Sequence, residues 1–389
     1  MLDVFASDLF FRIAVYAGSS TVCALLRASS SAHGSWIRLS VESKRALQWR
    51  TAIVGSFVPG TLFWDLLGVF TESGSRLQLV AIPHPRIRPA CVFDGSHLLY
   101  LLGGDCYAAG SSADCRRRGC AVDSFDMHKG RWATEPDMMT GRLHFGACRV
   151  GKDILAIGGI CATTFDFRNP RRRNILDSID VRHPTDGSWQ RRNVLPCGSY
   201  GFAIAIVASR IYVIGGVTTS HGQPVGPDGR DGPRAGGSVV VITEAGKIIR
   251  TSSGMPVPVS GCHAVVLGHR IVVLGGCILP EFLHGPGSHP ELDAGWSEPV
   301  QELNTLTGIW TILRKLPRRH LRSDPFSFDS GLCIRAATSI RIFGGFDFFC
   351  EMSAEMITDE RCQTWQVRQR SAGVFRSFKT GGAVDLCFD

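Results

Sequence analysis

The chain has 389 residues, of which 44% are hydrophobic and 20% are charged, and its formal net charge is +8. Such a composition is typical of a folded globular protein and excludes a disordered chain. Its apolar stretches end at Gly, Arg or Asp well before the roughly 18 residues that would predict a membrane span, so we expect no membrane partner. The opening segment is a poor signal peptide, because it lacks a basic start and because Asp3, Asp8 and Arg12 interrupt its apolar run.

The first fifty residues lack the pattern that fills the rest of the chain. Apolar side chains recur there at helical spacing in two short runs, separated by a Gly-Ser-Ser break. The runs contain Phe5, Leu9, Ile13 and Tyr16, then Val22, Leu25 and Leu26. We expect a small α-helical segment over residues 1–50 and a second domain over residues 51–389. One hypothesis is that these helices only cap the second domain.

The same segment resembles an F-box. The residues in register with that motif are Asp8, Leu9, Ile13, Leu25, Leu26, Ala28, Ser29 and Trp36. The usual proline near Ala6 is missing, and alanine replaces the leucine or valine usual around position 28. The resemblance implies that Leu9, Ile13, Leu25 and Leu26 contact a Skp-type adaptor protein.

Five pairs of glycines divide the chain from about residue 86 onward into similar units. Each pair closes a short apolar run, as in LLYLLGG, DILAIGG and RIYVIGG, and the pairs recur at intervals of 55 (158−103) to 69 (344−275) residues. Such a recurrence predicts one supersecondary unit that is used repeatedly. The pairs are Gly103-Gly104, Gly158-Gly159, Gly215-Gly216, Gly275-Gly276 and Gly344-Gly345. We expect them at strand ends where no side chain fits.

Each unit contains signals for four short strands. In residues 142–198, RLHFGACRV predicts one strand, and ILAIGG predicts a second across a turn at residues 151–153. After a loop over residues 160–174, ILDSIDVRHP and SWQRRNVLP predict the third and fourth strands. A tryptophan opens the fourth strand in four units, at Trp132, Trp189, Trp310 and Trp365, whereas the third unit has Ile248 there. Four strands per unit is typical of a propeller blade.

These units resemble kelch repeats, which are marked by a double glycine after an apolar strand and by a tryptophan further on. The resemblance implies an all-β fold, a kelch-type β-propeller of four-stranded blades. Residues 378–388 are expected to form one strand of a last blade, completed by strands within residues 53–83. Strands from both chain ends would then close the ring and leave no open sheet edge. We expect six blades, with five or seven as the alternatives because the N-terminal strands are poorly marked.

The fourteen cysteines follow the repeats rather than a disulfide framework. Cys91, Cys148 and Cys262 take similar places in three first strands, and Cys106, Cys161 and Cys277 follow glycine pairs. We expect buried free thiols and therefore a reducing location, in the cytoplasm, the nucleus or both. The alternative is a zinc site formed by Cys106, Cys115 and Cys120, but no CxxC or histidine pair accompanies them. We expect no metal and no cofactor.

Arginine greatly outnumbers lysine, and several arginines are clustered. In an antiparallel blade, the loop between strands 2 and 3 and the link to the next blade lie on one face, so the clusters are expected to form one basic rim. The expected rim residues are Arg116, Arg117, Arg118, Arg171, Arg172, Arg173, Arg318, Arg319 and Arg322, with Arg191 and Arg192 nearby. Guanidinium groups suit an acidic or phosphorylated protein substrate. Nucleic acid is not expected, because no aromatic residues are interleaved with the arginines. The alternative is a genome-wide bias toward arginine.

We find no P-loop, no HExxH and no GxSxG in a strand–turn–helix setting. The expected function is therefore a non-enzymatic interaction adaptor. With the F-box resemblance, it would be the substrate-recognition subunit of a cullin–RING ubiquitin ligase of the Skp–cullin–F-box type. The alternative is a kelch scaffold without a ligase link. A propeller enzyme would need a cluster of histidines and carboxylates at its central channel, of which the sequence gives no sign.

Overall fold

The computed structural model describes residues 49–55, 66–71, 77–84, 86, 89–104, 119–164, 174–218, 234–235, 237–276 and 299–315, and then short stretches over 332–336, 339–343, 346–347, 350–351, 354–359, 365–369 and 382–385. Apart from the helical residues Gly119 and Cys120, every element defined there is a β-strand. Among these residues there is no helix long and apolar enough to cross a membrane. The expected helical segment over residues 1–50 falls almost entirely outside the described residues.

The described strands form six four-stranded antiparallel sheets. Sheet 1 contains β4 (Ala90–Phe93), β5 (Leu98–Leu102), β6 (Val122–Asp126) and β7 (Arg131–Glu135), and sheet 2 contains β9 (Gly146–Val150), β10 (Asp153–Ile157), β12 (Ser178–Arg182) and β13 (Trp189–Val194). Sheet 3 contains β15 (Ala203–Val207), β16 (Arg210–Ile214), β19 (Ser238–Thr243) and β20 (Ile248–Ser253), and sheet 4 contains β21 (His263–Leu267), β22 (Arg270–Leu274), β23 (Pro299–Asn304) and β24 (Trp310–Lys315).

The last two sheets bring the end of the described chain back to its beginning. Sheet 5 contains β25 (Leu332–Ala336), β26 (Ser339–Phe343), β29 (Ala354–Asp359) and β30 (Trp365–Gln369). Sheet 6 contains β31 (Gly382–Asp385), β1 (Trp49–Gly55), β2 (Leu66–Thr71) and β3 (Leu77–Ala81). Within sheet 6, β31 pairs antiparallel with β1, so one sheet is built from both halves of the chain.

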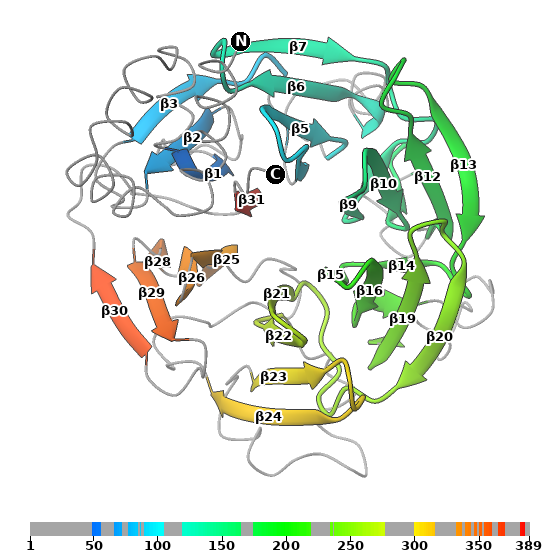
Figure 1. Ribbon diagram of the computed structural model, residues 1–389, viewed down its shortest axis with the longest axis vertical. Coiled ribbons are helices and arrows are strands. Elements are labelled where there is room, and N and C mark those ends of the chain that lie inside the picture. Colours follow the sequence, from blue (N-terminus) through cyan, green and yellow to red (C-terminus); the bar gives the residue numbers. More distant parts are fainter. Residues whose placement is uncertain are drawn as a thin grey trace, which may run out of the picture.

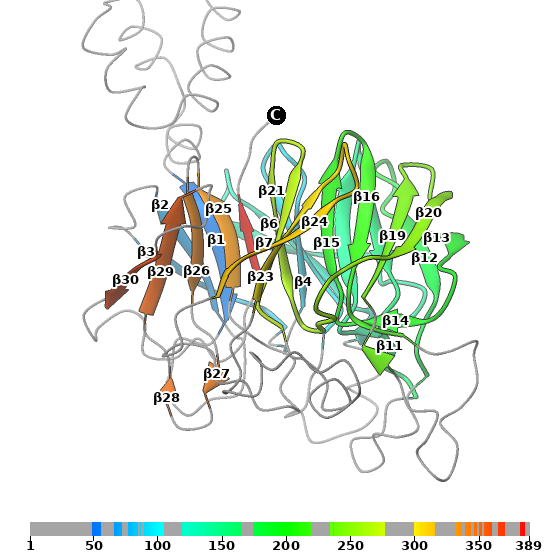
Figure 2. The same cartoon turned by 90° about the horizontal axis from the view of Figure 1, so that it is seen from below.

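The six sheets stand around a common centre (Figure 1). Their innermost strands contact one another in order: β4 with β9, β9 with β15, β15 with β21, β21 with β25, β25 with β31, and β31 with β4. Seen from the side, the sheets stand next to one another with their strands running across the thickness of the ring (Figure 2). This all-strand arrangement fits the predicted kelch-type β-propeller.

Apolar side chains pack between neighbouring sheets and hold them together. In β16, Ile211 and Val213 belong to a cluster shared with sheet 2, whereas Tyr212 and Ile214 belong to a cluster shared with sheet 4. Successive residues of a strand point to opposite faces, so a strand covered on both faces reads as a continuous apolar run. Each such side chain contributes about 1.5–3 kcal/mol when fully buried. The apolar runs that precede the glycine pairs are therefore the core of the fold.

The observed strands differ from the predicted ones in three places. RLHFGACRV was expected to form one strand, but His144 has a φ of +50°, which separates β8 (Arg142–Leu143) from β9. The expected loop over residues 160–174 contains β11 (Ile160–Cys161), which pairs with β8 and is too short to show a period in the sequence. β1 begins at Trp49, before the expected domain start. Of the strand expected over residues 378–388, the described residues include only β31.

The expectation of equivalent cysteines in the first strands is wrong. Cys91 pairs with Leu101, and Cys148 pairs with Leu155. Leu101 and Leu155 lie at different distances from the glycine pairs that follow them, so the two cysteines are not equivalent. Cys262 precedes β21 altogether. The mismatch arises because the β4–β5 turn is longer than the β9–β10 turn. The expected burial of free thiols is confirmed for Cys148, Cys161 and Cys262, while Cys91 is partly buried.

Candidate interaction surface

Strand 2 of each of sheets 1 to 4 runs into a double glycine on one side of the ring, which we call the double-glycine face. Loops and links pair with one another on this face: β8 with β11, and β14 (Ser199–Tyr200) with β17 (Val217–Thr218), which also pairs with β18 (Arg234–Ala235). In Figure 2 the short strands β11, β14, β27 (Phe346–Asp347) and β28 (Cys350–Glu351) lie on the same side of the ring. The expected meeting of strand 2–3 loops with the links between blades is confirmed for these described parts.

The double glycines join neighbouring sheets through main-chain atoms. In the first three pairs, the second glycine donates its N–H to a carbonyl in the link that enters the next sheet: Gly104 to Arg142 at 3.1 Å, Gly159 to Ser199 at 2.7 Å, and Gly216 to Val259 at 2.9 Å. At the first position, Gly158 has a φ of +56°, and a Cβ there would lie 2.6 Å from the Ser199 carbonyl oxygen. A side chain is therefore excluded by both backbone conformation and space, as expected from the sequence.

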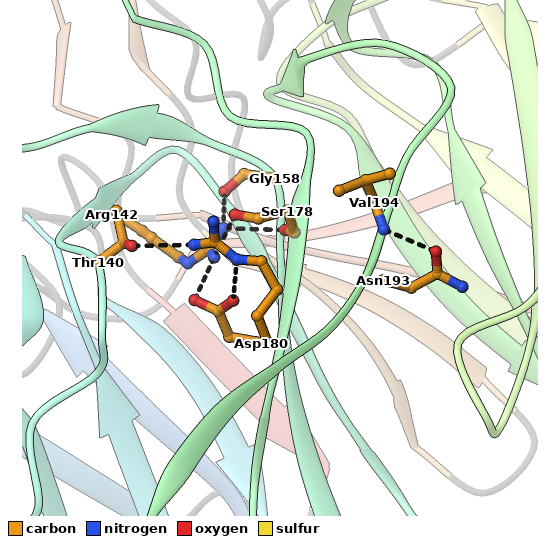
Figure 3. Close-up of polar contacts among 8 residues, drawn as sticks. Thr140, Arg142, Gly158, Ser178, Asp180, Asn193 and Val194 are labelled. Atoms are coloured by element: carbon orange, nitrogen blue, oxygen red, sulfur yellow. Dashed lines mark hydrogen bonds and ion pairs between the residues drawn. The ribbon is translucent and has the colours of Figure 1, made fainter.

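A buried arginine and aspartate attach the link to its own sheet beneath this joint. In sheet 2, Arg142 donates to Asp180 Oδ2 at 2.6 Å, to Ser178 Oγ at 2.7 Å and to the Gly158 carbonyl at 2.6 Å (Figure 3). Neither the Arg142 nor the Asp180 side chain is exposed. Burial lowers the pKa of Arg142, and the charge of Asp180 acts against this effect. Buried charges are tolerated when hydrogen bonds satisfy them, and this cluster provides such bonds to both terminal nitrogens of Arg142, although not to its Nε.

Sheet 1 repeats the arrangement with Arg86 and Asp123, which are also completely buried and form an ion pair. Arg86 donates to the Ala121 carbonyl at 2.7 Å and to the Gly103 carbonyl at 3.4 Å. Arg86 lies 17 residues before Gly103, and Arg142 lies 16 residues before Gly158. Our sequence reasoning missed both arginines, although this nearly constant distance to the glycine pair could have identified them.

Sheets 3 and 4 hold their links differently. Asp180 pairs with the residue that lies two positions before the double glycine of sheet 2. The residue with the same pairing is Val240 in sheet 3 and Gln301 in sheet 4. The Gln301 amide donates to the Val257 carbonyl at 2.8 Å and accepts from the Val257 N–H at 2.9 Å. Val240 packs in the apolar cluster shared with sheet 2. The main-chain joint is thus common to these sheets, whereas the side chains beneath it change.

A small apolar cluster supports the double-glycine face between sheets 2 and 3. It contains Leu143, Ile160, Ala162, Tyr200 and Val217, with Ile175 packed against it. Its residues come from β8, β11, β14 and β17 and the segments beside them, so it covers loops and links rather than the blade sheets. Tyr200 is only 1% exposed, which makes it one of the largest buried side chains of the described chain.

The nine arginines predicted to form a rim lie outside the described residues, namely Arg116, Arg117, Arg118, Arg171, Arg172, Arg173, Arg318, Arg319 and Arg322. The described chain nevertheless shows where their segments are attached. Segment 105–118 runs between Gly104 and Gly119, and segment 165–173 runs between Thr164 and Asn174. Segment 316–331 follows the last residue of β24. All three attachments are at the double-glycine face.

Several described arginines have a structural role that the sequence interpretation did not consider. Arg191 pairs with Asp180 at 3.1 Å and Arg192 pairs with Asp153 at 3.4 Å, so both bind carboxylates of their own sheet. Arg182 pairs with Glu135 of sheet 1, and its guanidinium lies 4.9 Å from the centre of the Tyr100 ring. Rim function and genome-wide bias are therefore not the only explanations for the abundance of arginine.

The remaining predicted site residues lie as follows. Trp132 is the second residue of β7, and Trp189, Trp310 and Trp365 begin β13, β24 and β30. The Trp189 Nε1 donates to the Pro136 carbonyl at 3.2 Å, which links sheets 1 and 2. Gly344 and Gly345 lie outside the described residues, as do the four residues of the F-box resemblance, Leu9, Ile13, Leu25 and Leu26.

The described residues include no group of three or more His, Cys, Asp or Glu side chains that could hold a metal ion. Cys161 lies on the double-glycine face, with its Sγ 3.0 Å from Thr163 Oγ1. Burial acts to raise the pKa of Cys161, but hydrogen bonds from Thr163 and Thr164 outweigh it, and the pKa is lowered. Chemically, the described part of this face offers hydrogen-bonding groups and attachment points for cationic segments.

No protein-family model matches this chain. Among curated proteins, Kelch-like protein 34 of Homo sapiens is similar, with 24% identity over 247 residues, which are 62% of this chain and 33% of the relative. The chain thus covers about one third of the length of that relative. Together with the antiparallel four-stranded sheets, the similarity supports a kelch-repeat fold. The comparisons give no support to the F-box resemblance.

Proposed function

We propose that this protein is a non-enzymatic adaptor that binds an acidic protein segment, phosphorylated or not, on its double-glycine face. The observation that carries the proposal is that segments 105–118, 165–173 and 316–331 are attached to this one face and carry the arginine clusters. The glycine joints, the arginine–aspartate pairs and the cluster around Tyr200 give segments 105–118 and 165–173 a packed base. Guanidinium groups there are suited to carboxylates and phosphates through paired hydrogen bonds.

We also propose that the ring has six blades and that β31 closes it as the innermost strand of the last blade. The pairing of β31 with β1 and the order of contacts among the innermost strands support this proposal. Closure would matter for binding, because it fixes the blades relative to one another and thus fixes the positions of the segments that they carry.

Charge reversal tests the binding proposal. The variant Arg117→Glu with Arg172→Glu is compared with Arg210→Glu, which changes an exposed arginine at the β15–β16 hairpin on the opposite side of the ring. Fluorescence anisotropy with a labelled glutamate-rich peptide, and with the same peptide carrying phosphoserine, measures affinity. We expect the double variant to lose binding while the control binds normally, with equal unfolding midpoints for both. Normal binding by the double variant, or no binding by the unaltered protein, contradicts the proposal.

The proposed link to a ubiquitin ligase is tested separately. It rests on the resemblance of residues 1–50 to an F-box, in which Leu9 and Ile13 would contact a Skp-type adaptor. We expect the full chain to co-purify with such an adaptor and Leu9→Ala with Ile13→Ala to abolish this. If the unaltered chain does not co-purify, the alternative of a kelch-repeat scaffold, with the N-terminal segment capping the ring, is favoured. Peptide binding is independent of this outcome.

A further inference from the structure

Three consecutive links are joined by main-chain hydrogen bonds on the double-glycine face. The Gly201 N–H donates to the His144 carbonyl at 2.9 Å, and the Gly261 N–H donates to the Gly201 carbonyl at 2.6 Å. Each of these residues lies two positions before an innermost strand, β9, β15 or β21. These strands surround the centre of the ring (Figure 1), so the three residues occupy equivalent places where the central axis opens onto the double-glycine face.

His144 is the exception among these three equivalent residues. The φ angles of His144, Gly201 and Gly261 are +50°, +64° and +70°, all in the left-handed region. Glycine adopts this conformation freely, whereas an L-residue with a Cβ is disfavoured there. Two of the three links thus use the residue that the backbone favours, and the link into sheet 2 does not. Its backbone conformation alone gives no reason for a histidine.

The surroundings of the His144 side chain suggest what it contributes. Its ring is partly buried beside Tyr200, with ring centroids 6.4 Å apart and planes inclined at 60°. Tyr200 is held in the apolar cluster that supports the face, so it limits the positions that the imidazole can take. An imidazole offers ring nitrogens that donate or accept hydrogen bonds, and it carries a positive charge when protonated. Local backbone strain of this kind is often retained where the side chain serves a function.

We infer that His144 is a specificity-determining contact of the double-glycine face, which donates a hydrogen bond to a carboxylate of the bound acidic segment as that segment crosses the mouth of the central axis. This inference rests on the proposed function and adds to it one residue near the centre of the face. Among the three described links that are joined here, only the one into sheet 2 presents a side chain, because the equivalent residues in sheets 3 and 4 are Gly201 and Gly261. Such an asymmetric contact would set the direction in which the segment lies.

The test compares three variants in the full chain. His144→Gly introduces the residue found at the two equivalent positions, His144→Asn keeps a hydrogen-bonding side chain that tolerates the left-handed region, and Gly201→Ala adds a Cβ at the equivalent place in the next link. Affinity for the labelled glutamate-rich peptide is measured by anisotropy, and folding is measured by the urea midpoint of unfolding.

We expect His144→Gly to weaken peptide binding about tenfold, as for the loss of one hydrogen bond to a charged group, without lowering the urea midpoint. His144→Asn should retain part of the affinity. Gly201→Ala should lower the midpoint and leave the affinity unchanged. Normal binding by His144→Gly overturns the inference, and so does a lowered midpoint, which would show that the ring serves packing. If the arginine double variant loses binding and His144→Gly does not, only the inference fails; if the unaltered protein does not bind the peptide, both fail.

Discussion

Removing the Asp180 carboxylate should destabilise the fold far more than removing a partly exposed carboxylate from the same sheet. In Asp180→Ala, Arg142 loses its buried ionic partner and keeps only hydrogen bonds to Ser178 and Gly158. The guanidinium cannot reach water, because neither side chain of the pair is exposed. Arg191 also loses its contact with Asp180, but its side chain is 49% exposed and can be hydrated.

The expected magnitude follows from this difference in burial. Removing one partner of a buried pair leaves an uncompensated charge in the protein and costs about 3–5 kcal/mol. The pair between Arg192 and Asp153 provides the matched control, since its side chains are 36% and 28% exposed and its atoms are 3.4 Å apart. Exposed pairs of this kind are worth about 0.2–1 kcal/mol. Asp180→Ala should therefore be several times more costly than Asp153→Ala.

Urea unfolding followed by tryptophan fluorescence measures both variants. A third variant, Arg142→Met with Asp180→Leu, removes both charges and fills similar volume, so it should be more stable than Asp180→Ala alone. It should not recover the full free energy of unfolding, because the Gly158 and Ser178 carbonyls lose a donor. Equal losses in Asp180→Ala and Asp153→Ala would refute the reasoning, since burial would then make no difference.

Three further predictions concern the backbone and a buried thiol. Gly158→Ala should lower the free energy of unfolding by about 2–4 kcal/mol, and Gly151→Ala by only about 1 kcal/mol. Both glycines have a positive φ, but only Gly158 lacks space for a Cβ. Equal losses of free energy in urea unfolding would contradict this. Ala208→Asn with Ser209→Gly should raise the free energy of unfolding by about 1–2 kcal/mol. Both residues have a positive φ in an exposed two-residue hairpin turn, a conformation that Asn and Gly favour. An unchanged urea midpoint would contradict this. Burial raises the pKa of the Cys148 thiol from 9.0 to about 12, so the free energy of unfolding should fall as the pH rises from 9 towards 12, where only the unfolded chain loses this proton. Cys148→Val should make the free energy of unfolding fall less steeply over that range, as measured by unfolding at successive pH values. An identical pH dependence in the variant would contradict this.

The repeat could be predicted from the sequence because its signals are local. A glycine pair follows each apolar run, and β16, for example, is the run RIYVI directly before Gly215. Ile211 and Tyr212 pack in clusters on opposite faces of the sheet. This follows from the two-residue period of a strand once a neighbouring sheet covers each face. The same local reasoning expected the pairing of chain ends now observed between β31 and β1.

Side-chain contacts on the double-glycine face could not be predicted in the same way. Arg142 and Asp180 are 38 residues apart, and neither differs in type from the exposed charges around it. The β8–β11 pairing involves two residues on each strand, which is too few for a period. The prediction that Cys91 and Cys148 occupy equivalent positions was wrong because the turns after their strands differ in length. Only the observed pairing of the strands shows this difference.

The double-glycine face separates the parts that hold the ring together from the parts that can vary. The joints use main-chain atoms, so the accepting residue in the link can be Arg142, Ser199 or Val259 without loss of the hydrogen bond. In the described part of the chain, apolar clusters between the sheets hold neighbouring sheets together. The binding proposal predicts that substitutions in segments 105–118 and 165–173 change binding while leaving the free energy of unfolding almost unchanged. If the Arg117 and Arg172 variant loses peptide binding at an unchanged unfolding midpoint, the loss is due to the lost charges rather than to unfolding.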